Sequence, residues 1–295
     1  MEEAAFEEAQ DGLAARPVTM ERYRELLRAF DATVCEALAV GQATSGRMAE
    51  PHVGYGTHIF ARICGHAVSF VRAAPHSRWV KSDSENWDFS AIAGHARSIV
   101  EGYLFFAYMT HPPANAEELN ARVNVMHLYD CTKRIRVLGG VVDKTMLEDF
   151  EKSAEEIRKR LKQNGWFSQL KDTLQEKLLK GGELTILSRP EQLELVEWKA
   201  REFYMFWDIL SQYAHILTFS FYRMEHNGRG TGINNDADRF YIGLFLEHCA
   251  EVLSDCVDRM IVLFPDAAPV RKGIDSKFSP GPRRNLPRER KRKRR

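Results

Sequence analysis

The sequence lacks an uninterrupted apolar run long enough to cross a membrane. Its longest apolar stretch, Phe203 to Tyr222, contains Asp208, Gln212 and His215, and such polar groups are costly inside a bilayer. The N-terminal segment MEEAAFEEAQDGLAARP is acidic and has no apolar core like that of a secretory signal peptide. These absences argue against membrane-spanning and secreted proteins, and they predict a soluble, cytoplasmic one.

Cysteine is scarce, and its spacing suits neither a disulfide framework nor a metal site. The five cysteines are far apart and form no C-x-x-C pair, and the chain contains no E-x-x-H pair. The segment NGRGTGINND is rich in glycine but lacks the pattern of a phosphate-binding loop, so we interpret it as a flexible connection. We expect reduced thiols in the core, no metal centre and no cofactor.

The sequence does contain ample apolar material, arranged with a helical period. Hydrophobic residues make up 44% of the 295 residues, which is enough for a sizeable core. Apolar side chains recur three and four residues apart almost throughout, and only 184–187 resembles a strand. We expect helices over 19–41, 57–74, 88 or 90 to 109, 115–139, 143–163, 166–179, 190–224 and 236–264.

These helices predict an all-α fold, a helical bundle of about seven to eight helices with long central helices. We place an acidic flexible leader at residues 1–17 and a single bundle domain at 18–268. Residues 143–182 are highly charged and are interpreted as a peripheral helical insertion in that domain. A disordered basic tail is expected at 269–295, because it has few apolar side chains to bury.

Positive charge is concentrated at the end of the chain. The segment RRNLPRERKRKRR has nine basic residues and one acidic residue, a net charge of +8; since the whole chain carries +1, the remainder carries −7. A basic arm of this kind binds RNA or another polyanion by releasing counterions, or it only solubilises the protein or folds back on the acidic body. The candidate nucleic-acid-binding residues are Arg283, Arg284, Arg288, Arg290, Lys291, Arg292, Lys293, Arg294 and Arg295.

Two of the expected helices carry polar residues at positions surrounded by apolar ones. The first helix has Arg97, Ser98 and Glu101, and the second has Asp208, Ser211 and His215. Residues four apart share a helix face, so Arg97 and Glu101 can pair directly. On the second helix Tyr204, Asp208, Ser211, His215 and Thr218 form one polar stripe. Because buried polar groups need partners, we expect the two stripes to face each other.

Two interpretations of this cluster remain open. It is either a buried network that fixes the register of the helices or a cleft that does chemistry. In the second case His215 acts as an acid or base, Glu101 or Asp208 orients it, and Arg97 holds an anion. That arrangement suits cleavage of a phosphodiester without a metal ion.

A second candidate pair is Arg122 and His127, in the sequence ARVNVMHLYD. On a helix, five residues apart leaves the two side chains roughly adjacent. This R-x4-H spacing resembles that of the HEPN superfamily of helical ribonucleases. The resemblance implies that Arg122 contacts the phosphate and that His127 assists proton transfer from the ribose 2′-hydroxyl.

The chain also resembles an uncharacterised family of bacterial all-helical proteins. The shared motifs are R-S-x-x-E, here residues 97–101, and S-x-x-x-H, here residues 211–215. The resemblance extends over about residues 55–265 and implies a helical bundle in which the polar cluster is important. HEPN-like domains often pair through helices, so a homodimer is the arrangement that the analogy implies.

Two hypotheses of different class follow. One is a HEPN-like protein that binds RNA or another nucleic acid, with metal-independent endoribonuclease activity as its enzymatic form. The other is a noncatalytic helical module that docks a partner protein and uses the basic tail as an electrostatic tether.

Overall fold

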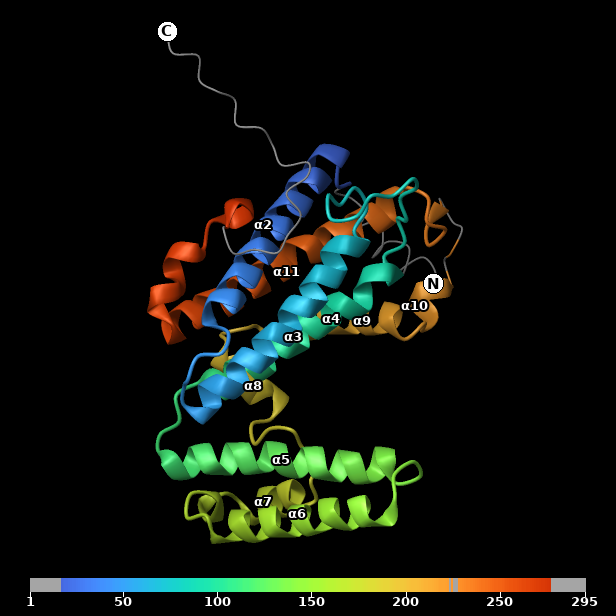
Figure 1. The fold of residues 1–295 in the computed structure, drawn as a ribbon. Helices are drawn as coiled ribbons and strands as arrows, with labels where there is room; N and C mark the ends of the chain where they lie inside the picture. The colour runs from blue at the N-terminus through green and yellow to red at the C-terminus, as the bar shows by residue number, and fades with distance from the viewer. Residues whose placement is uncertain (1–16, 223, 225–227, 277–295) are drawn as a thin grey trace. The chain divides into compact units, whose positions relative to one another are not determined.

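A computed structural model describes residues 17–222, 224 and 228–276. Every regular element in these residues is helical, which confirms the all-α prediction (Figure 1). They form ten α-helices, α2 to α11, and short 3-10 helices, where about seven to eight helices were predicted. The predicted leader up to residue 16 and the tail from residue 277 onward, with all nine candidate nucleic-acid-binding residues, lie outside the described residues.

The chain forms two compact units. Of the described residues, unit 1 comprises 17–49, 57–106, 199–222, 224 and 228–276, and unit 2 comprises 50–56 and 107–198. The segment 143–182, predicted as a peripheral insertion, lies within unit 2. In the part of the chain that the structure describes, none of the helices has both the length and the apolar content needed to cross a bilayer.

Unit 1 is built around two long helices, α2 (Met20–Thr44) and α11 (Asp236–Leu263), which pack along each other (Figure 1). Helix α2 begins as predicted, because Thr19 Oγ1 accepts a hydrogen bond from Arg22 N at 3.2 Å. Their buried residues are mostly apolar and include Phe30, Val34, Phe245, Leu246 and Leu253. Cys249 and Cys256 of α11 are buried free thiols in this core, as expected.

Helices α3 (Pro51–Ala73) and α4 (Ser90–Thr110) complete this part of the core. Helix α3 begins six residues before the predicted Thr57, because proline suits a first helical turn and Gly54 and Gly56 do not interrupt it. Gly102 lets α4 approach α3 closely, since a Cβ at this position would lie 2.8 Å from Ile63 Cγ1.

The single helix predicted over 190–224 is wrong. It is divided into α8 (Arg189–Leu195), α9 (Ala200–Ala214) and α10 (Thr218–Phe221). Glu197 and Ile216 lie at the two breaks with φ of 56° and 54°, and a left-handed residue ends an α-helix. Glycine is the residue that usually signals such an end, and neither position has one. His215 is therefore the C-terminal cap of α9, and the predicted stripe from Tyr204 to Thr218 is not continuous.

Unit 2 contains α5 (Ala116–Leu138), α6 (Lys144–Gln163) and α7 (Asp172–Leu179). Helices α5 and α6 lie side by side after a short connection (Figure 1), and they begin near the predicted positions, where Asn115 and Asp143 cap them. The helix expected over 166–179 is interrupted, because a 3-10 turn at Phe167–Gln169 precedes α7. Residues 184–187 form no strand; Ile186 N instead donates to Tyr108 Oη at 3.2 Å. The unit has its own apolar core, which includes Val125, Leu128, Ile157, Leu161 and Phe167.

The described part of the glycine-rich segment, residues 228–235, is held by Asp238 rather than being a loose connection. The buried Asp238 carboxylate accepts from Gly230 N at 2.8 Å and from Asn235 Nδ2 at 2.7 Å. Trp87 N also donates to Gly232 O at 2.9 Å. A carboxylate that accepts several hydrogen bonds in the interior fixes the backbone around it, which explains why this segment has a defined path.

The folded chain continues past residue 268. Two 3-10 helices, η3 (Pro265–Val270) and η4 (Gly273–Asp275), follow α11, and Ser276 is fully buried. The two short helices contact α2, so this segment is part of unit 1.

Candidate functional site

Arg97 of α4 pairs with Glu101 one helical turn away. Both its Nε and its Nη2 lie 3.3 Å from Glu101 Oε1, the geometry expected for residues four apart. The Arg97 side chain is 19% exposed and that of Glu101 is 35% exposed. The pair is therefore half-buried and within reach of solvent.

Trp207 of α9 completes the environment of this pair. Its Nε1 donates to Glu101 Oε1 at 2.6 Å, and the Arg97 Cζ lies 4.7 Å from the centre of the indole ring. The buried Ser211 donates to the Trp207 carbonyl at 2.6 Å and so supports the same turn of α9. The indole thus holds the carboxylate by a hydrogen bond and stabilises the guanidinium by a cation–π contact.

His215 contacts the other side of the Arg97 guanidinium. Its Nε2 lies 2.5 Å from Arg97 Nη1. A guanidinium can only donate, so in a hydrogen bond between these atoms Nε2 is the acceptor. The cluster therefore contains one guanidinium, one carboxylate and one imidazole. We call Arg97, Glu101, Trp207, Ser211 and His215 the Arg97 cluster.

The backbone is strained directly after His215. Ile216 has φ of 54°, an uncommon conformation for a β-branched residue, and it is 76% exposed. Strain of this kind costs of the order of 1 to 3 kcal/mol and is often found at functional sites. It ends α9 at a point where the His215 ring lies at the surface.

The predicted contact between the two stripes is present at one place, where Arg97 of α4 meets His215 at the end of α9, while Glu101 pairs with Arg97 within α4. Asp208 is exposed on α9, and among the contacts of the described residues none joins it to Arg97 or His215. Glu101 is occupied by Arg97 and Trp207, so it does not orient the imidazole as expected. Ser98 also lies apart, because its hydroxyl donates to Gly94 O at 2.9 Å.

Arg122 and His127, the second predicted pair, lie in unit 2 and have separate partners. Arg122 is buried; it pairs with Glu118 and donates to the carbonyls of Tyr108 and His111 at 3.3 and 2.9 Å. His127 Nε2 is 2.7 Å from Tyr55 Oη. No hydrogen bond or ion pair in the described part of the chain joins Arg122 to His127. The Arg122 side chain is thus occupied by the protein itself.

The segment after His215 exposes large apolar side chains. Ile216, Leu217 and Phe219 lie beside the predicted polar stripe, at positions where an apolar helix would bury them, but each is at least 43% exposed. We call residues 216–222 the exposed apolar segment; its exposed members are Ile216, Leu217, Phe219, Phe221 and Tyr222. A cluster of this kind marks an interaction surface more often than an isolated exposed residue does.

Sequence reasoning missed the role of Trp207, because an indole in an apolar helix was taken as a core residue. The available signal was its spacing, four residues before Ser211 and eight before His215. It also missed a buried ion pair of unit 1, in which Arg78 contacts Asp31. Asp31 within the apolar helix of residues 20–44 was the signal there.

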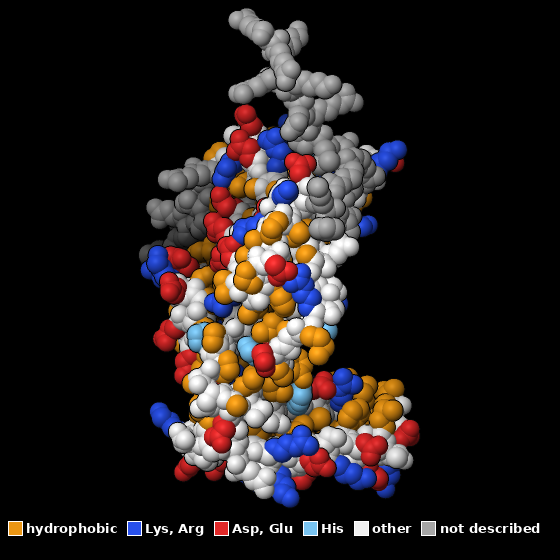
Figure 2. Space-filling model, turned by 60° about the vertical axis from the view of Figure 1, so that its left-hand side comes forward, with side chains coloured by type: hydrophobic (Ala, Val, Ile, Leu, Met, Phe, Trp, Pro, Cys, Tyr) orange, Lys and Arg blue, Asp and Glu red, His pale blue; other side chains and the backbone are white. Residues whose placement is uncertain are grey.

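Charged side chains of both signs lie on the surface of the protein. On the face drawn in Figure 2, acidic and basic side chains are interspersed among hydrophobic ones, with no broad field of one sign among the described residues. In the described ranges, no three His, Cys, Asp or Glu side chains gather in a way that suits a metal ion.

Comparison with known proteins adds no relative from which a role for these residues could be transferred. No protein-family model, curated protein or solved structure matches this chain.

Proposed function

We propose that this protein binds single-stranded RNA through the Arg97 cluster and the exposed apolar segment. The observation that carries the proposal is the contact of 2.5 Å between Arg97 Nη1 and His215 Nε2. One edge of the arginine cation is covered there by the exposed imidazole of His215 rather than by a second carboxylate. A phosphate oxygen that replaces Nε2 would gain a charge-assisted hydrogen bond.

The exposed apolar segment supplies the second element that single-stranded RNA requires. Phe219, Phe221 and Tyr222 are between 45% and 79% exposed and follow His215 closely in the chain. Bases stack on such rings with about 1 to 3 kcal/mol each and with little dependence on sequence. A phosphate at Arg97 and bases on these rings would together bind a short stretch of RNA.

Arg97 and His215 also support cleavage of the bound RNA without a metal ion, which requires more of the site than binding alone. His215 Nε2 would accept the proton of a ribose 2′-hydroxyl while the 2′-oxygen bonds to phosphorus. The bond to the 5′-oxygen breaks, and that oxygen takes a proton from water. Arg97 would pair with the charge on the phosphate.

The test must separate the Arg97 cluster from the basic tail, which carries nine cations of its own. Binding of a labelled single-stranded RNA is measured by fluorescence anisotropy at two salt concentrations. The variants are Arg97→Ala, a full-length protein with the nine tail cations changed to Gln, and their combination. We expect Arg97→Ala to weaken binding at least tenfold in both backgrounds and the tail change to reduce the salt dependence.

Arg201→Ala provides the control, because Arg201 is an exposed arginine of α9 outside the cluster. It should bind RNA like the wild type. Equal affinity of the Arg97→Ala protein and the wild type in the tail-neutral background would refute the proposal. Incubation of the same RNA with EDTA, with wild type and with His215→Ala, then tests cleavage separately from binding.

A second candidate function is the docking of a partner protein, and the exposed apolar segment favours it as well. In that case the partner would bury Ile216 and Leu217, which have no role in stacking. The two functions differ in salt dependence, because an apolar contact persists at salt concentrations that release RNA. Retention of a partner, but not RNA, at high salt would favour docking.

A further inference from the structure

Unit 1 contains a cavity of about 600 Å³ that is separate from the Arg97 cluster. Helices α2 and α3, the connection 75–85 and Ile274 of η4 line it. We propose that it binds a small amphipathic organic anion. The apolar body of the ligand would lie against Leu27, Val71, Val80 and Ile274, and its anionic group would pair with Arg28 and Lys81.

The floor of the cavity is a neutralised ion pair. Arg78 donates to both oxygens of Asp31 at 2.5 and 2.9 Å, and Trp79 Nε1 donates to Asp31 Oδ1 at 2.6 Å. The Asp31 side chain is 7% exposed, so its charge is compensated within the protein. This pair shapes the floor and leaves no net charge to attract or repel a ligand.

The remaining charges of the cavity favour an anion. Its other carboxylate, Glu85, accepts from His76 N at 2.8 Å and lies 3.7 Å from His76 Nδ1. In the described part of the chain no carboxylate pairs with Arg28 or Lys81; Arg28 Nε donates to Arg24 O at 3.2 Å. Beside the paired Asp31 and Arg78, the two cations Arg28 and Lys81 outnumber the carboxylate of Glu85, which favours a negatively charged group.

The rim is held in place before any ligand arrives. His76 has φ of 61°, an unusual value for a residue other than glycine, and the hydrogen bond to Glu85 stabilises it. The preceding residue is also fixed, because Tyr23 Oη donates to Pro75 O at 2.9 Å. A preformed rim reduces the entropy that binding would lose.

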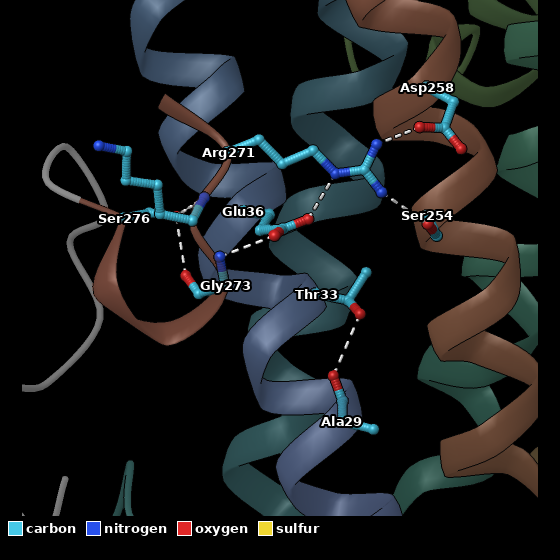
Figure 3. Close-up of polar contacts among 9 residues, drawn as sticks. Ala29, Thr33, Glu36, Ser254, Asp258, Arg271, Gly273 and Ser276 are labelled. Atoms are coloured by element: carbon cyan, nitrogen blue, oxygen red, sulfur yellow. Dashed lines mark hydrogen bonds and ion pairs between the residues drawn. The ribbon is translucent and has the colours of Figure 1, made fainter. Parts of the chain in front are cut away.

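Ile274 forms one wall of the cavity, and hydrogen bonds and ion pairs hold the segment that carries it in place (Figure 3). Glu36 of α2 accepts from Arg271 Nε at 2.6 Å and from Gly273 N at 2.7 Å. Arg271 reaches α11 as well, where its Nη2 donates to Ser254 Oγ at 3.0 Å. Gly273, directly before Ile274, is thus hydrogen-bonded to α2. This contact fixes the position of Ile274 relative to Leu27 and Arg28, which also belong to α2.

The size and lining of the cavity define the ligand class. Pockets of roughly 300 to 1,000 Å³ with apolar walls and a few polar groups take small organic molecules rather than macromolecules. Sodium octanoate and hexyl phosphate serve as probes, because each joins an anionic group to an alkyl chain. Octanamide is the matched neutral probe.

Binding to the full-length protein is measured by isothermal titration calorimetry. We expect both anions to bind and octanamide to bind at least tenfold more weakly. The double variant Arg28→Gln/Lys81→Gln should lose at least tenfold in affinity for octanoate. Val80→Trp, which fills the cavity from its exposed rim, should abolish the binding heat.

Arg24→Gln is the charge-matched control, since Arg24 lies one turn from Arg28 on α2 and does not line the cavity. Its affinity for octanoate should equal that of the wild type, and circular dichroism checks that every variant is folded. Three results would each overturn the proposal: no binding of either anion, equal binding of octanamide, or unchanged octanoate affinity in the double variant. Unchanged binding to Val80→Trp would place the probe elsewhere and overturn it too.

Discussion

Arg97 on α4 and Arg122 on α5 each pair with a glutamate four residues away and lie over an aromatic ring. The carboxylates are Glu101 and Glu118, and the Cζ-to-ring distances are 4.7 Å to Trp207 and 5.3 Å to Tyr108. The two arginines differ in what occupies their remaining donors. Arg122 reaches two backbone carbonyls, whereas Arg97 reaches Nε2 of His215.

This difference separates an arginine whose donors are taken by the buried fold from one that contacts an exposed side chain. The carbonyls beneath Arg122 belong to the end of α4, where the helix leaves carbonyl groups without helical partners. Arg122 donates hydrogen bonds to them and is only 8% exposed, and its charge is compensated by Glu118 within the protein. Among the described residues Arg97 donates to no backbone group, and its contact outside α4 is to the exposed His215 and the ring of Trp207.

The largest expected effect is that of Arg122→Ala on stability. Removing this side chain leaves Glu118 buried without its partner and two carbonyls without a donor. Breaking a buried pair in this way costs about 3 to 5 kcal/mol. Urea denaturation followed by circular dichroism measures the loss.

Arg134→Ala on the same helix is the control for that measurement. Arg134 also pairs with a carboxylate four residues away, Asp130, at 2.7 Å, but both side chains are about half exposed. Its denaturation midpoint should equal that of the wild type. If Arg122→Ala denatured at the same midpoint as Arg134→Ala, the contrast between structural and available arginines would fail.

A smaller effect is expected from His248, whose ring stacks on Phe206 of α9 at 4.6 Å. Burial lowers the pKa of His248 from about 6.5 to about 4. Between these pH values the unfolded chain binds a proton that the folded protein does not, so stability is lost as the pH falls through that range. The whole shift corresponds to roughly 3 kcal/mol.

His248→Gln cannot titrate in this range and should remove that part of the pH dependence. The free energy of unfolding is measured by urea denaturation at pH 7, 6, 5 and 4 for both proteins. The slope between pH 6.5 and pH 4 should be shallower in the variant, because carboxylates titrate equally in both. Parallel curves for the two proteins would show that the imidazole is not protected by its burial against α9.

The fold could be predicted where local chemistry decides it. Thr19, Asn115 and Asp143 cap helices as expected, since an N-cap needs only the few residues around it. The breaks at Glu197 and Ile216 could not be predicted, because left-handed residues other than glycine are stabilised by their surroundings and leave no mark in composition. Because these two breaks were not predicted, the predicted helix was longer than α9, and its polar residues were expected to form one continuous stripe.

The candidate site, like the fold, could be predicted from the sequence only in part. Helical spacing was sufficient to bring Arg97, Glu101 and His215 together, because polar residues on apolar faces must find one another. The separation of Arg122 from His127 was not predictable, since the acceptors of Arg122 are mostly backbone carbonyls. Every residue has such a carbonyl, so no sequence pattern identifies the ones that a buried arginine will satisfy.

Of the substitutions at Arg122, His248 and Arg97, Arg97→Ala should reduce stability the least. It gives the most direct test of the difference between Arg97 and Arg122. Its half-exposed pair with Glu101 should contribute about 1 kcal/mol or less, which thermal and urea denaturation can resolve beside Arg122→Ala. A loss as large as that of Arg122→Ala would mean that Arg97 also holds the fold together. Weaker RNA binding by that variant would then reflect unfolding, whereas weaker binding at nearly unchanged stability identifies Arg97 as the residue that the ligand contacts.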